Sequence, residues 1–300
     1  MADLLVLDWG TSSFRAYLLD KDGTIENSLS SDSGILHRKD RGFEEVLKKH
    51  LHQLAGYTHG MPVIASGMIT SRQGWVETGY CECPVRPQDL AANLVPLHSE
   101  AAGTIHFVAG VKQCRPTPDI MRGEECQLAG LEGAETRQVI LPGTHSKWVQ
   151  MEDGAISRFC TFMTGDIYQA LTRTTILRAL PHTEWTEEGF RLGVKEGFHL
   201  QATHRGLLAS LFQVRVKSIL EEMSGEKAAG FLSGILIGAE IAEAGELRLA
   251  GSLPYLVIGS EELTGVYCRA LQYCGLSGLA ASPHMAARGL FTIARHANII

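Results

Sequence analysis

The sequence has no concentrated basic segment, no Cys-x-x-Cys pair and no unbroken apolar run that we expect to cross a membrane. Its formal net charge is −6, which makes nucleic acid and anionic membranes poor expected partners. Its seven cysteines are an odd number at scattered positions, so a disulfide framework and a zinc site are both disfavoured. The chain enters an apolar strand at once, with Asp3 and Asp8 in it, which is unlike a signal peptide. These absences predict a cytoplasmic protein with reduced thiols.

Two common nucleotide-binding fingerprints are also missing. No Gly-Lys-Ser/Thr run precedes a helix, as it does in a Walker loop, and no Gly-x-Gly-x-x-Gly segment occurs. A nucleotide site in this chain must therefore be built in another way. The composition leaves ample material for the surrounding fold, because 45% of the 300 residues are hydrophobic and can form the cores of two lobes.

The same local design occurs twice along the chain. Residues 4–19 and 139–151 each read as an apolar strand, a short turn rich in hydroxyl groups, and a second strand. Glycine lets the backbone approach a phosphate group closely, and neighbouring Thr and Ser residues supply hydroxyl and amide donors. Two such turns in different halves predict that both bind one polyphosphate. The expected phosphate-binding residues are Gly10, Thr11, Ser12 and Ser13 in the first turn, and Gly143, Thr144, His145, Ser146 and Lys147 in the second.

Strands alternate with helices in both halves, which predicts an α/β protein. In the first half we expect strands at 4–8, 14–19, 24–28, 61–67 and 105–110, an amphipathic helix at 43–55 and a loop at 67–90. In the second half we expect strands at 138–151, 155–161 and 254–260, and helices at 166–179, 208–223 and 228–244. The last of these helices carries Gly230, Gly234 and Gly238 on one face, where we expect a very close neighbour. That neighbour is either a helix that spans the domains or the nucleotide itself.

Three carboxylates are candidates for the chemistry. Asp8 ends a buried strand, where Mg²⁺ bound to ATP would compensate its charge; alternatively, it accepts hydrogen bonds from the turn amides. Glu124 and Glu125 lie in the first turn of a helix expected at 121–130, where the helix dipole favours them. Because their side chains point about 100° apart, one can face solvent while the other faces a cleft and accepts a proton from a substrate hydroxyl. We favour Glu125 slightly for that role.

Three motifs stand out: Asp-x-Gly-Thr-Ser-x-x-Arg at 8–15, Gly-Thr-x-Ser at 143–146, and Val-Ile-Gly-Ser at 257–260. Together they resemble the sugar kinase, heat-shock protein and actin superfamily. Within it, the chain is similar nearly end to end to the 2-dehydro-3-deoxygalactonokinase family. The segments that carry this resemblance are 67–75, 121–125, 141–148, 161–165 and 234–238. The family usually has Glu after Met-Thr-Gly, where this chain has Asp166, which leaves a direct role for that position open.

The resemblance implies a fold of two duplicated ribonuclease H-like lobes, as in actin-like ATPases, with an ATP cleft between them. Residues 1–133 together with 284–300 would form the N-terminal lobe, which holds the sugar-acid site and the first phosphate turn. Residues 134–283 would form the C-terminal lobe, with the second turn and the adenosine site. The implied reaction is ATP-dependent phosphorylation of the terminal 6-hydroxyl of 2-dehydro-3-deoxy-D-galactonate, with Mg²⁺ held by Asp8.

A sugar-acid substrate presents a carboxylate, which an arginine fork binds well. Arg72 follows directly after a strand end, and Trp75 would stack on the carbon chain of the substrate. Gln73 and Glu77 would bind hydroxyl groups. The alternative interpretation is a surface arginine and a packed tryptophan. Arg15 is a weaker candidate, because it could simply pair with a neighbouring carboxylate.

Four residues of the second half also have two interpretations. His145 is a candidate proton carrier or a hydrogen-bonding scaffold, and Lys147 is a phosphate counter-charge or a solvated strand residue. Gly259 and Ser260 resemble an adenosine-binding loop, although a plain turn from strand to helix explains them equally well.

Two rival functions remain open from the sequence. One is hydrolysis of polyphosphate or a nucleotide, and the other is a non-catalytic ATP-gated module. The expected partners are ATP and a sugar acid, and a homo-oligomer stays open. The residues alone do not distinguish the galactonate epimer from the gluconate epimer.

Overall fold

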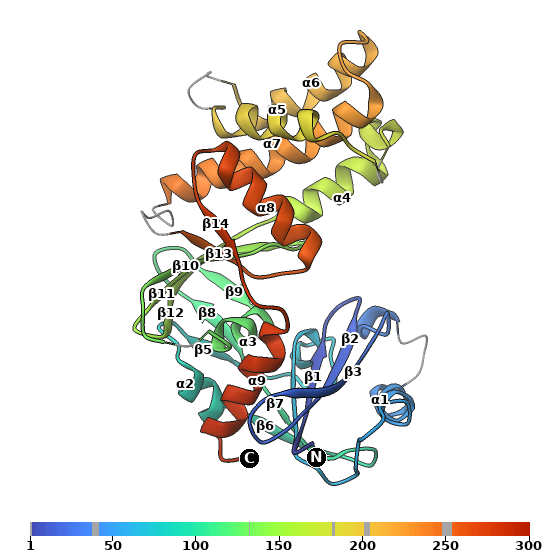
Figure 1. Ribbon diagram of the computed structural model, residues 1–300, viewed down its shortest axis with the longest axis vertical. Coiled ribbons are helices and arrows are strands. Elements are labelled where there is room, and N and C mark those ends of the chain that lie inside the picture. The colour runs from blue at the N-terminus through green and yellow to red at the C-terminus, as the bar shows by residue number, and fades with distance from the viewer. Residues whose placement is uncertain (1, 38–41, 132, 182–183, 201–204, 248–253) are drawn as a thin grey trace. The chain divides into compact units, whose positions relative to one another are not determined.

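The computed structural model describes residues 2–37, 42–131, 133–181, 184–200, 205–247 and 254–300 (Figure 1). Its contacts divide the chain into two units. The first unit comprises Met1–Thr136, Met151–Arg158 and His284–Ile300, and the second comprises Arg137–Gln150 and Phe159–Pro283. The domain ranges and the roles that the sequence suggested for them stay predictions.

A six-stranded sheet organises the first unit, in the order β3-β2-β1-β4-β7-β6. These strands are β1 (Leu4–Trp9), β2 (Phe14–Leu19), β3 (Ile25–Ser31), β4 (Val63–Ser66), β6 (Val95–Ser99) and β7 (Gly103–Phe107). β1 pairs antiparallel with β2 but parallel with β4, and β4 pairs parallel with β7. The carboxyl ends of β1, β4 and β7 therefore lie at one edge of the sheet, which is where ligands bind in open α/β sheets.

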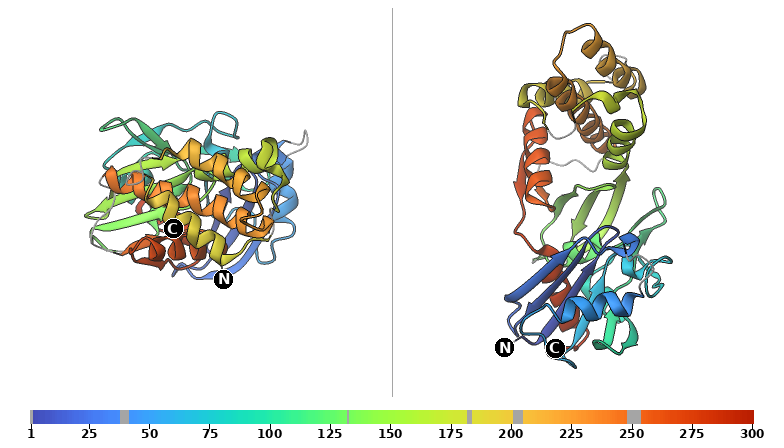
Figure 2. Two further views of the ribbon diagram at one scale, coloured as in Figure 1. Left: turned by 90° about the horizontal axis from the view of Figure 1, so that it is seen from above. Right: turned by 90° about the vertical axis from the view of Figure 1, so that its right-hand side faces the viewer.

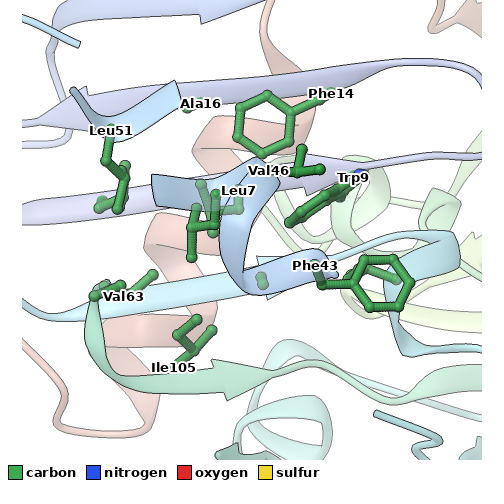
Figure 3. Packing of buried hydrophobic residues seen from close by; sticks show 14 of the residues in the cluster. Leu7, Trp9, Phe14, Ala16, Phe43, Val46, Leu51, Val63 and Ile105 are labelled. Carbon is green, nitrogen blue, oxygen red and sulfur yellow. The ribbon is translucent and has the colours of Figure 1, made fainter. Parts of the chain in front are cut away.

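Helix α1 (Phe43–Leu51) covers this sheet with a single apolar face (Figure 3). Phe43 and Val46 from the helix pack against Trp9, Phe14 and other buried residues of the strands. The helix was predicted at 43–55 and begins as expected, but it ends four residues earlier. A turn follows the helix at Leu51. Leu54 lies in this turn and is buried, so its apolar spacing resembles that of a helical residue although it is outside the helix.

The rest of the first unit is richer in short elements than the sequence indicated. It contains η1 (Ile35–His37), η2 (Met68–Thr70), α2 (Pro87–Ala92), α3 (Glu124–Ala129), α9 (Met285–His296) and a small sheet of β5 (Tyr80–Glu82), β8 (Gly110–Gln113) and β9 (Asp119–Met121). The prediction of a continuous loop at 67–90 was wrong, because η2, β5 and the start of α2 lie in it. The strand predicted at 105–110 ends at Phe107, and Gly110 begins a different sheet. Most of these elements are only three to six residues long, too short to produce a periodic signal.

A five-stranded sheet, most of which belongs to the second unit, repeats the strand order of the first sheet. It runs β12-β11-β10-β13-β14, which corresponds element by element to β3-β2-β1-β4-β7. Met151–Arg158, with the end of β11 and the start of β12, is grouped with the first unit. The strands are β10 (Arg137–Leu141), β11 (Ser146–Glu152), β12 (Ala155–Phe162), β13 (Tyr255–Val257) and β14 (Gly278–Ala280). β10 is parallel to β13, and β13 is parallel to β14. The predicted fold class of two duplicated α/β lobes is confirmed.

Helices make up most of the second unit. They are α4 (Thr164–Thr174), η3 (Ile176–Ala179), α5 (Glu187–Phe198), α6 (Leu207–Ile219), α7 (Gly225–Glu246) and α8 (Glu261–Tyr273). The helix predicted at 166–179 is two elements, which separate at Thr175 where the backbone is extended. The helices predicted at 208–223 and 228–244 are present with slightly different ends. The sequence analysis did not predict α5, which contains three glycines and therefore has a low helix propensity.

Helices α5 and α7 pack backbone against backbone, side by side in Figure 1 and in the view from above in Figure 2. A Cβ atom on Gly230 would lie 2.7 Å from the Thr186 carbonyl oxygen, and one on Gly234 would lie 2.7 Å from the Val194 nitrogen. Gly238 lies equally close to α5. In return, α5 presents its own glycines at the same four-residue spacing, Gly189, Gly193 and Gly197. The close neighbour of the glycine face is thus a helix of the same unit, so the alternatives of a domain-spanning helix or the nucleotide were wrong.

Helix α7 is also long and apolar enough to cross a membrane by length and composition alone, contrary to the expectation from the sequence. However, 72% of its most apolar window is buried inside the structure. Burial of this extent is what a core helix shows, and the apolar side chains of α7 belong to buried clusters of the second unit.

We predict that Gly234→Ala destabilises the protein by about 1–3 kcal/mol or more, because the added methyl group would overlap the backbone of α5. Gly245→Ala is the matched control: it lies on the same helix, and no atom lies within 4 Å of the position that its methyl group would take. That change should be neutral or raise the free energy of unfolding by up to about 1 kcal/mol. Chemical denaturation of both variants measures the difference. Equal stability of the two variants would contradict the packing described above.

Candidate functional site

The first phosphate turn, between β1 and β2, is held by backbone hydrogen bonds. The Gly10 amide donates to the Ser13 carbonyl oxygen at 2.9 Å, and the Gly10 carbonyl oxygen accepts from the Ile35 amide at 3.0 Å. Gly10 is therefore engaged within the protein and is not a donor for phosphate, contrary to the sequence prediction. Among the described residues, no acceptor is found for the amides of Thr11 and Ser12, both of which are exposed. These groups remain suitable for binding an anion.

Asp8 lies beside Arg15 across the first hairpin. Arg15 Nη1 donates to Asp8 Oδ2 at 3.0 Å, and the Asp8 side chain is 18% exposed. Burial raises the pKa of the Asp8 carboxyl, and the Arg15 guanidinium opposes that effect. The interpretation of Arg15 as the partner of a neighbouring carboxylate is confirmed, and the alternative that Asp8 binds the turn amides is not what the structure shows.

Three chain segments meet by direct backbone contact just beyond Asp8. Gly67, which follows β4, has φ 96°, and a Cβ there would lie 2.7 Å from the Trp9 carbonyl oxygen. Gly123, which precedes α3, has φ 106°, and its Cβ would lie 3.2 Å from the Gly67 Cα atom. Both positions require glycine, since this region of φ is strained for other residues. The contact brings the end of β1, the loop after β4 and the first turn of α3 together.

Glu125 is buried in the first turn of α3, with 1% of its surface exposed. Both of its carboxylate oxygens accept from the Gly123 amide, at 2.8 and 2.7 Å. Burial, together with the nearby charge of Glu124, raises the pKa of Glu125 to about 7. The side chain adjoins a cavity with Val85 and Leu90 whose free volume of about 10 Å³ is close to the least that one water needs. Glu125 thus points into the first unit rather than toward open solvent.

Glu124 is the more exposed of the two glutamates. One of its carboxylate oxygens accepts from the Arg122 amide at 3.0 Å. Glu124 and Glu125 therefore differ in environment, as the sequence analysis expected for successive residues of a helix. The buried side chain is that of Glu125, the favoured candidate for the base.

Arg122 is a residue that the sequence analysis did not single out. Its Nη1 atom donates to the Thr70 carbonyl oxygen, the Thr70 hydroxyl and the Thr78 hydroxyl at 2.6–2.7 Å. Its Nη2 atom donates to the Thr78 carbonyl oxygen at 3.2 Å, and its guanidinium lies 4.4 Å from the centre of the Tyr80 ring. Arg122 therefore fixes both ends of the segment that carries the expected substrate residues. Its position inside the Met-Arg-Gly-Glu-Glu motif was the signal available.

The expected substrate residues lie on the segment between β4 and β5. Gln73 is exposed, and Arg72 and Glu77 reach the surface of the same loop, as ligand-binding side chains must. Trp75 is partly buried instead: its ring stacks on Phe43 with centroids 5.9 Å apart and meets Trp9 edge-on at 6.4 Å. The alternative of a packed tryptophan fits this placement, and one face of the ring is covered by protein.

The second phosphate turn, between β10 and β11, is anchored by a buried polar network. The Ser146 hydroxyl lies 2.8 Å from the Tyr267 hydroxyl, which donates to Glu240 Oε2 at 2.9 Å. Trp148 Nε1 donates to Glu240 Oε1 at 2.7 Å, and burial raises the pKa of Glu240. Ser146 is fully buried and its hydroxyl faces the interior, so the predicted contact of this residue with phosphate stays a prediction. Lys147 is 5% exposed, so the alternative of a solvated strand lysine was wrong.

The exposed part of this turn rests on the beginning of α4. The Asp166 amide donates to the Thr144 carbonyl oxygen at 2.9 Å, and His145 Nε2 lies 3.7 Å from Asp166 Oδ2. Gly165 touches the backbone of Gly143 and Thr144, where a Cβ atom would not fit. Asp166 therefore contacts the turn through His145, and the His145 scaffold interpretation fits this geometry.

Gly259 and Ser260 connect β13 to α8. The Ser260 hydroxyl accepts from the Leu263 amide at 3.3 Å and caps the helix. A Cβ on Gly259 would lie 3.5 Å from the Pro142 side chain, an ordinary contact distance. The pair is exposed and lies beside the residue that precedes the second turn. Its capping role supports the plain interpretation of a turn from strand to helix, and its place at the carboxyl end of β13 keeps it available to a ligand.

A magnesium ion is compatible with Asp8. Among the residues that the structure describes, no group of three or more His, Cys, Asp or Glu side chains could hold a metal ion. Mg²⁺ in nucleotide enzymes needs only one or two carboxylates, since phosphates and waters complete its shell. Ser66 pairs with Asp8 on the neighbouring strand, and its buried hydroxyl has no hydrogen-bond partner among the described residues. A partly exposed carboxylate beside an unsatisfied hydroxyl fits a hydrated cation.

Comparison with known proteins identifies similar chains. A family model described as 2-keto-3-deoxy-galactonokinase matches residues 8–293. A Rhizobium meliloti (strain 1021) protein, assigned as a 2-dehydro-3-deoxygalactonokinase, is 36% identical and aligns with 96% of this chain and 95% of its own. The Escherichia coli (strain K12) 2-dehydro-3-deoxygalactonokinase is 31% identical over 91% of each chain. The crystal structure of a Sinorhizobium meliloti protein assigned to the same kinase has a TM-score of 0.87 at 35% identity and covers 97% of this chain and 98% of its own.

We predict that Glu125→Gln changes the pH dependence of stability. The pKa of Glu125 rises from 4.5 to about 7 on folding, so the native state holds this proton more tightly than the unfolded chain. The bound proton therefore stabilises the native state fully below pH 4.5. As the pH rises from 4.5 through 7, the free energy of unfolding falls by up to about 3 kcal/mol. Urea denaturation at pH 5 and pH 8 should show the variant gaining on the natural chain at the higher pH. If the free energies of unfolding of the two proteins change in parallel with pH, folding does not raise the pKa of Glu125.

Proposed function

We propose that this chain, which belongs to the 2-keto-3-deoxy-galactonokinase family, transfers the γ-phosphoryl group of ATP to the terminal 6-hydroxyl of 2-dehydro-3-deoxy-D-galactonate. The family makes it a sugar kinase, with ATP and a sugar acid as small-molecule partners. The observation that carries the finer proposal is the glycine contact in the first unit. It joins the partly exposed carboxylate of Asp8 to the helix that carries Glu124 and Glu125. We expect the reaction in the cytoplasm, where ATP is available.

Phosphoryl transfer depends on positioning and on neutralising charge more than on covalent chemistry by the protein. Asp8 would hold Mg²⁺. The bound ion would offset the negative charge of the phosphate groups. The amides and hydroxyls of exposed Thr11 and Ser12, and of partly buried Ser13, would bind phosphate oxygens in the first unit. In the second unit, Gly143, Thr144 and His145 would bind phosphate, and Lys147 would add a buried positive charge behind the turn. Gly259 and Ser260 would contact the adenosine.

Glu125 would take the proton of the attacking hydroxyl. A general base works best when its pKa lies near the working pH, and a value of about 7 meets that condition. The Gly123 amide orients the carboxylate, because it binds both oxygens. Glu124 remains the alternative base, since it is less buried and lies one residue earlier in the same turn.

The acceptor would bind to the segment after β4. Arg72 is the proposed partner of the substrate carboxylate, and Gln73 and Glu77 of its hydroxyls, because all three lie on a surface segment that Arg122 holds at both ends. Trp75 would offer its uncovered surface to the carbon chain. The measurement for this assignment is the KM of Arg72→Ala, which should rise for the sugar acid and stay constant for ATP.

A panel of acceptors tests the proposed reaction. The protein is incubated with Mg-ATP and either 2-dehydro-3-deoxygalactonate, 2-dehydro-3-deoxygluconate or no acid, and ADP release is followed. We expect release only with the galactonate, because a kinase that excludes water consumes little ATP without its acceptor. Release that requires no acid would indicate a phosphohydrolase. No release with any acid would indicate an ATP-gated module, and release with the gluconate alone would assign the other epimer.

The two glutamates are distinguished by matched substitutions. Glu125→Gln should lower kcat by about 10²–10⁴-fold and leave the KM for ATP nearly unchanged, because only proton transfer is lost. Glu124→Gln is the control, since it removes the same charge from the same helical turn and should retain most of the turnover. The reverse pattern would make Glu124 the base, and normal turnover in both variants would remove general-base catalysis by this helix.

A further inference from the structure

We propose that the second unit carries a dimerisation surface, the outer face of α6, which binds the same face of a second copy of this chain. Helix α6 packs on α7, and its inner residues Leu211 and Val214 belong to a buried cluster. Its other side presents Leu208, Phe212 and Ile219 to solvent, with 85%, 58% and 59% of their surfaces exposed. Single exposed apolar side chains are common, but several large ones on one helix face mark an interaction site.

The spacing of these residues is that of a helix that pairs with another helix. The row consists of Leu208, Phe212, Arg215 and Ile219, at intervals of four, three and four residues. Such intervals place side chains in one line along a helix, as at the a and d positions of a coiled coil. The line is about 16 Å long, because a helix rises about 1.5 Å per residue. We call these four residues the α6 face.

The α6 face is complementary to itself when two copies lie antiparallel. Its intervals are the same when counted from either end, so a two-fold axis between Phe212 and Arg215 superimposes one row on the other. Leu208 then lies opposite Ile219 of the second copy. Phe212 lies opposite Arg215 of the second copy, and symmetry makes each pairing twice. A parallel pair would instead place the two Arg215 side chains together, and their like charges would repel.

The central pairing joins an aromatic ring to a cation that is available for it. Among the residues that the structure describes, none forms a hydrogen bond or an ion pair with the Arg215 side chain, and none makes a ring contact with Phe212. A guanidinium over an aromatic face is attractive, and Arg and aromatic residues are enriched at the centres of interfaces. The dimer therefore gives both side chains of each copy a partner.

The charges at the ends of α6 also favour the antiparallel arrangement. The helix has no acidic residue in its first turn, and its N-cap Gly206 provides no side-chain hydrogen bond. Exposed Glu221 and Glu222 follow the carboxyl end, where the helix dipole disfavours negative charge. In the antiparallel pair these glutamates lie beside the amino end of the other helix, where the dipole favours them. A second copy thus supplies the charge that each helix end lacks.

Paired charge substitutions test both the surface and its register. Leu208→Lys and Ile219→Glu each place a charge against an apolar side chain twice in the dimer, so each should weaken self-association by at least about tenfold. An equimolar mixture of the two variants should regain the dimer, because one contact becomes Lys opposite Glu and the other remains Leu opposite Ile. Sedimentation equilibrium of the full chain at about 1–100 μM measures the association, since a small interface is expected to bind weakly.

Leu279→Lys is the matched control. It places the same charge at a leucine of the second unit that is 55% exposed and lies on β14, so self-association should be unchanged. All three substituted side chains are exposed, and circular dichroism should show the same secondary structure in every variant. No ATP or sugar acid is present, so the result does not depend on the proposed kinase reaction.

Three results would overturn the proposal. The first is a natural chain that stays monomeric over the whole range; if phosphatidylcholine vesicles then bind the natural chain but not Leu208→Lys, the α6 face is a membrane-binding surface. The second is a dimer that both substitutions leave intact, because another surface would join the copies. The third is a mixture of the two variants that stays monomeric, which would refute the antiparallel pairing.

Discussion

The contact of Trp9, Gly67 and Gly123 is the constraint on which the candidate site of the first unit depends. Each of the three residues directly adjoins a functional segment: Asp8 precedes Trp9, the substrate loop follows Gly67, and the two glutamates follow Gly123. Side chains at the two glycines would push these segments apart, and phosphoryl transfer tolerates little misplacement. Backbone contact therefore fixes the positions of these segments, as side-chain packing does for other elements of the core. The two glycines permit this contact because they have no side chain.

The second unit fixes the equivalent strand end by other means. Its turn between β10 and β11 is tied to the interior through Ser146, Tyr267 and Glu240, and Trp148 completes the network. A buried network of this kind is stabilising only when its members are satisfied, and the Glu240 oxygens each have a donor. The duplicated sheets thus share strand order but not the device that holds the phosphate turn. Duplication at the level of topology leaves the local chemistry free to differ.

The sequence was sufficient for the features with strong local signals. Both strand-turn-strand hairpins, the buried strand before Gly67 and the helix that begins at Glu124 could be predicted, because each combines an apolar run with a punctuating residue. The short sheet of β5, β8 and β9 and helix α5 could not, since three-residue strands and glycine-rich helices carry weak propensities. The placements of the Ser146 and Trp75 side chains could not be predicted for a different reason: a turn or loop motif does not reveal which side chains turn inward. Long-range partners such as Arg122 with Thr70 and Thr78 are invisible until the chain is folded.

Three acids of low exposure show how a structural carboxylate differs from a candidate catalytic one. Burial raises the pKa of Asp8, Glu125 and Glu240 alike, so the direction of the shift does not separate them. Their partners do. Glu240 receives a strong side-chain donor on each oxygen, whereas Glu125 has one backbone amide shared by both oxygens and the weak donor of the Cys126 thiol at 3.5 Å from Oε1, and Asp8 has Arg15 on Oδ2. A carboxylate with unused accepting capacity, held by glycine contacts at the end of a parallel strand, can still bind a cation or a proton. That remaining capacity, more than the perturbed pKa, is the physical reason to place the chemistry at Asp8 and Glu125.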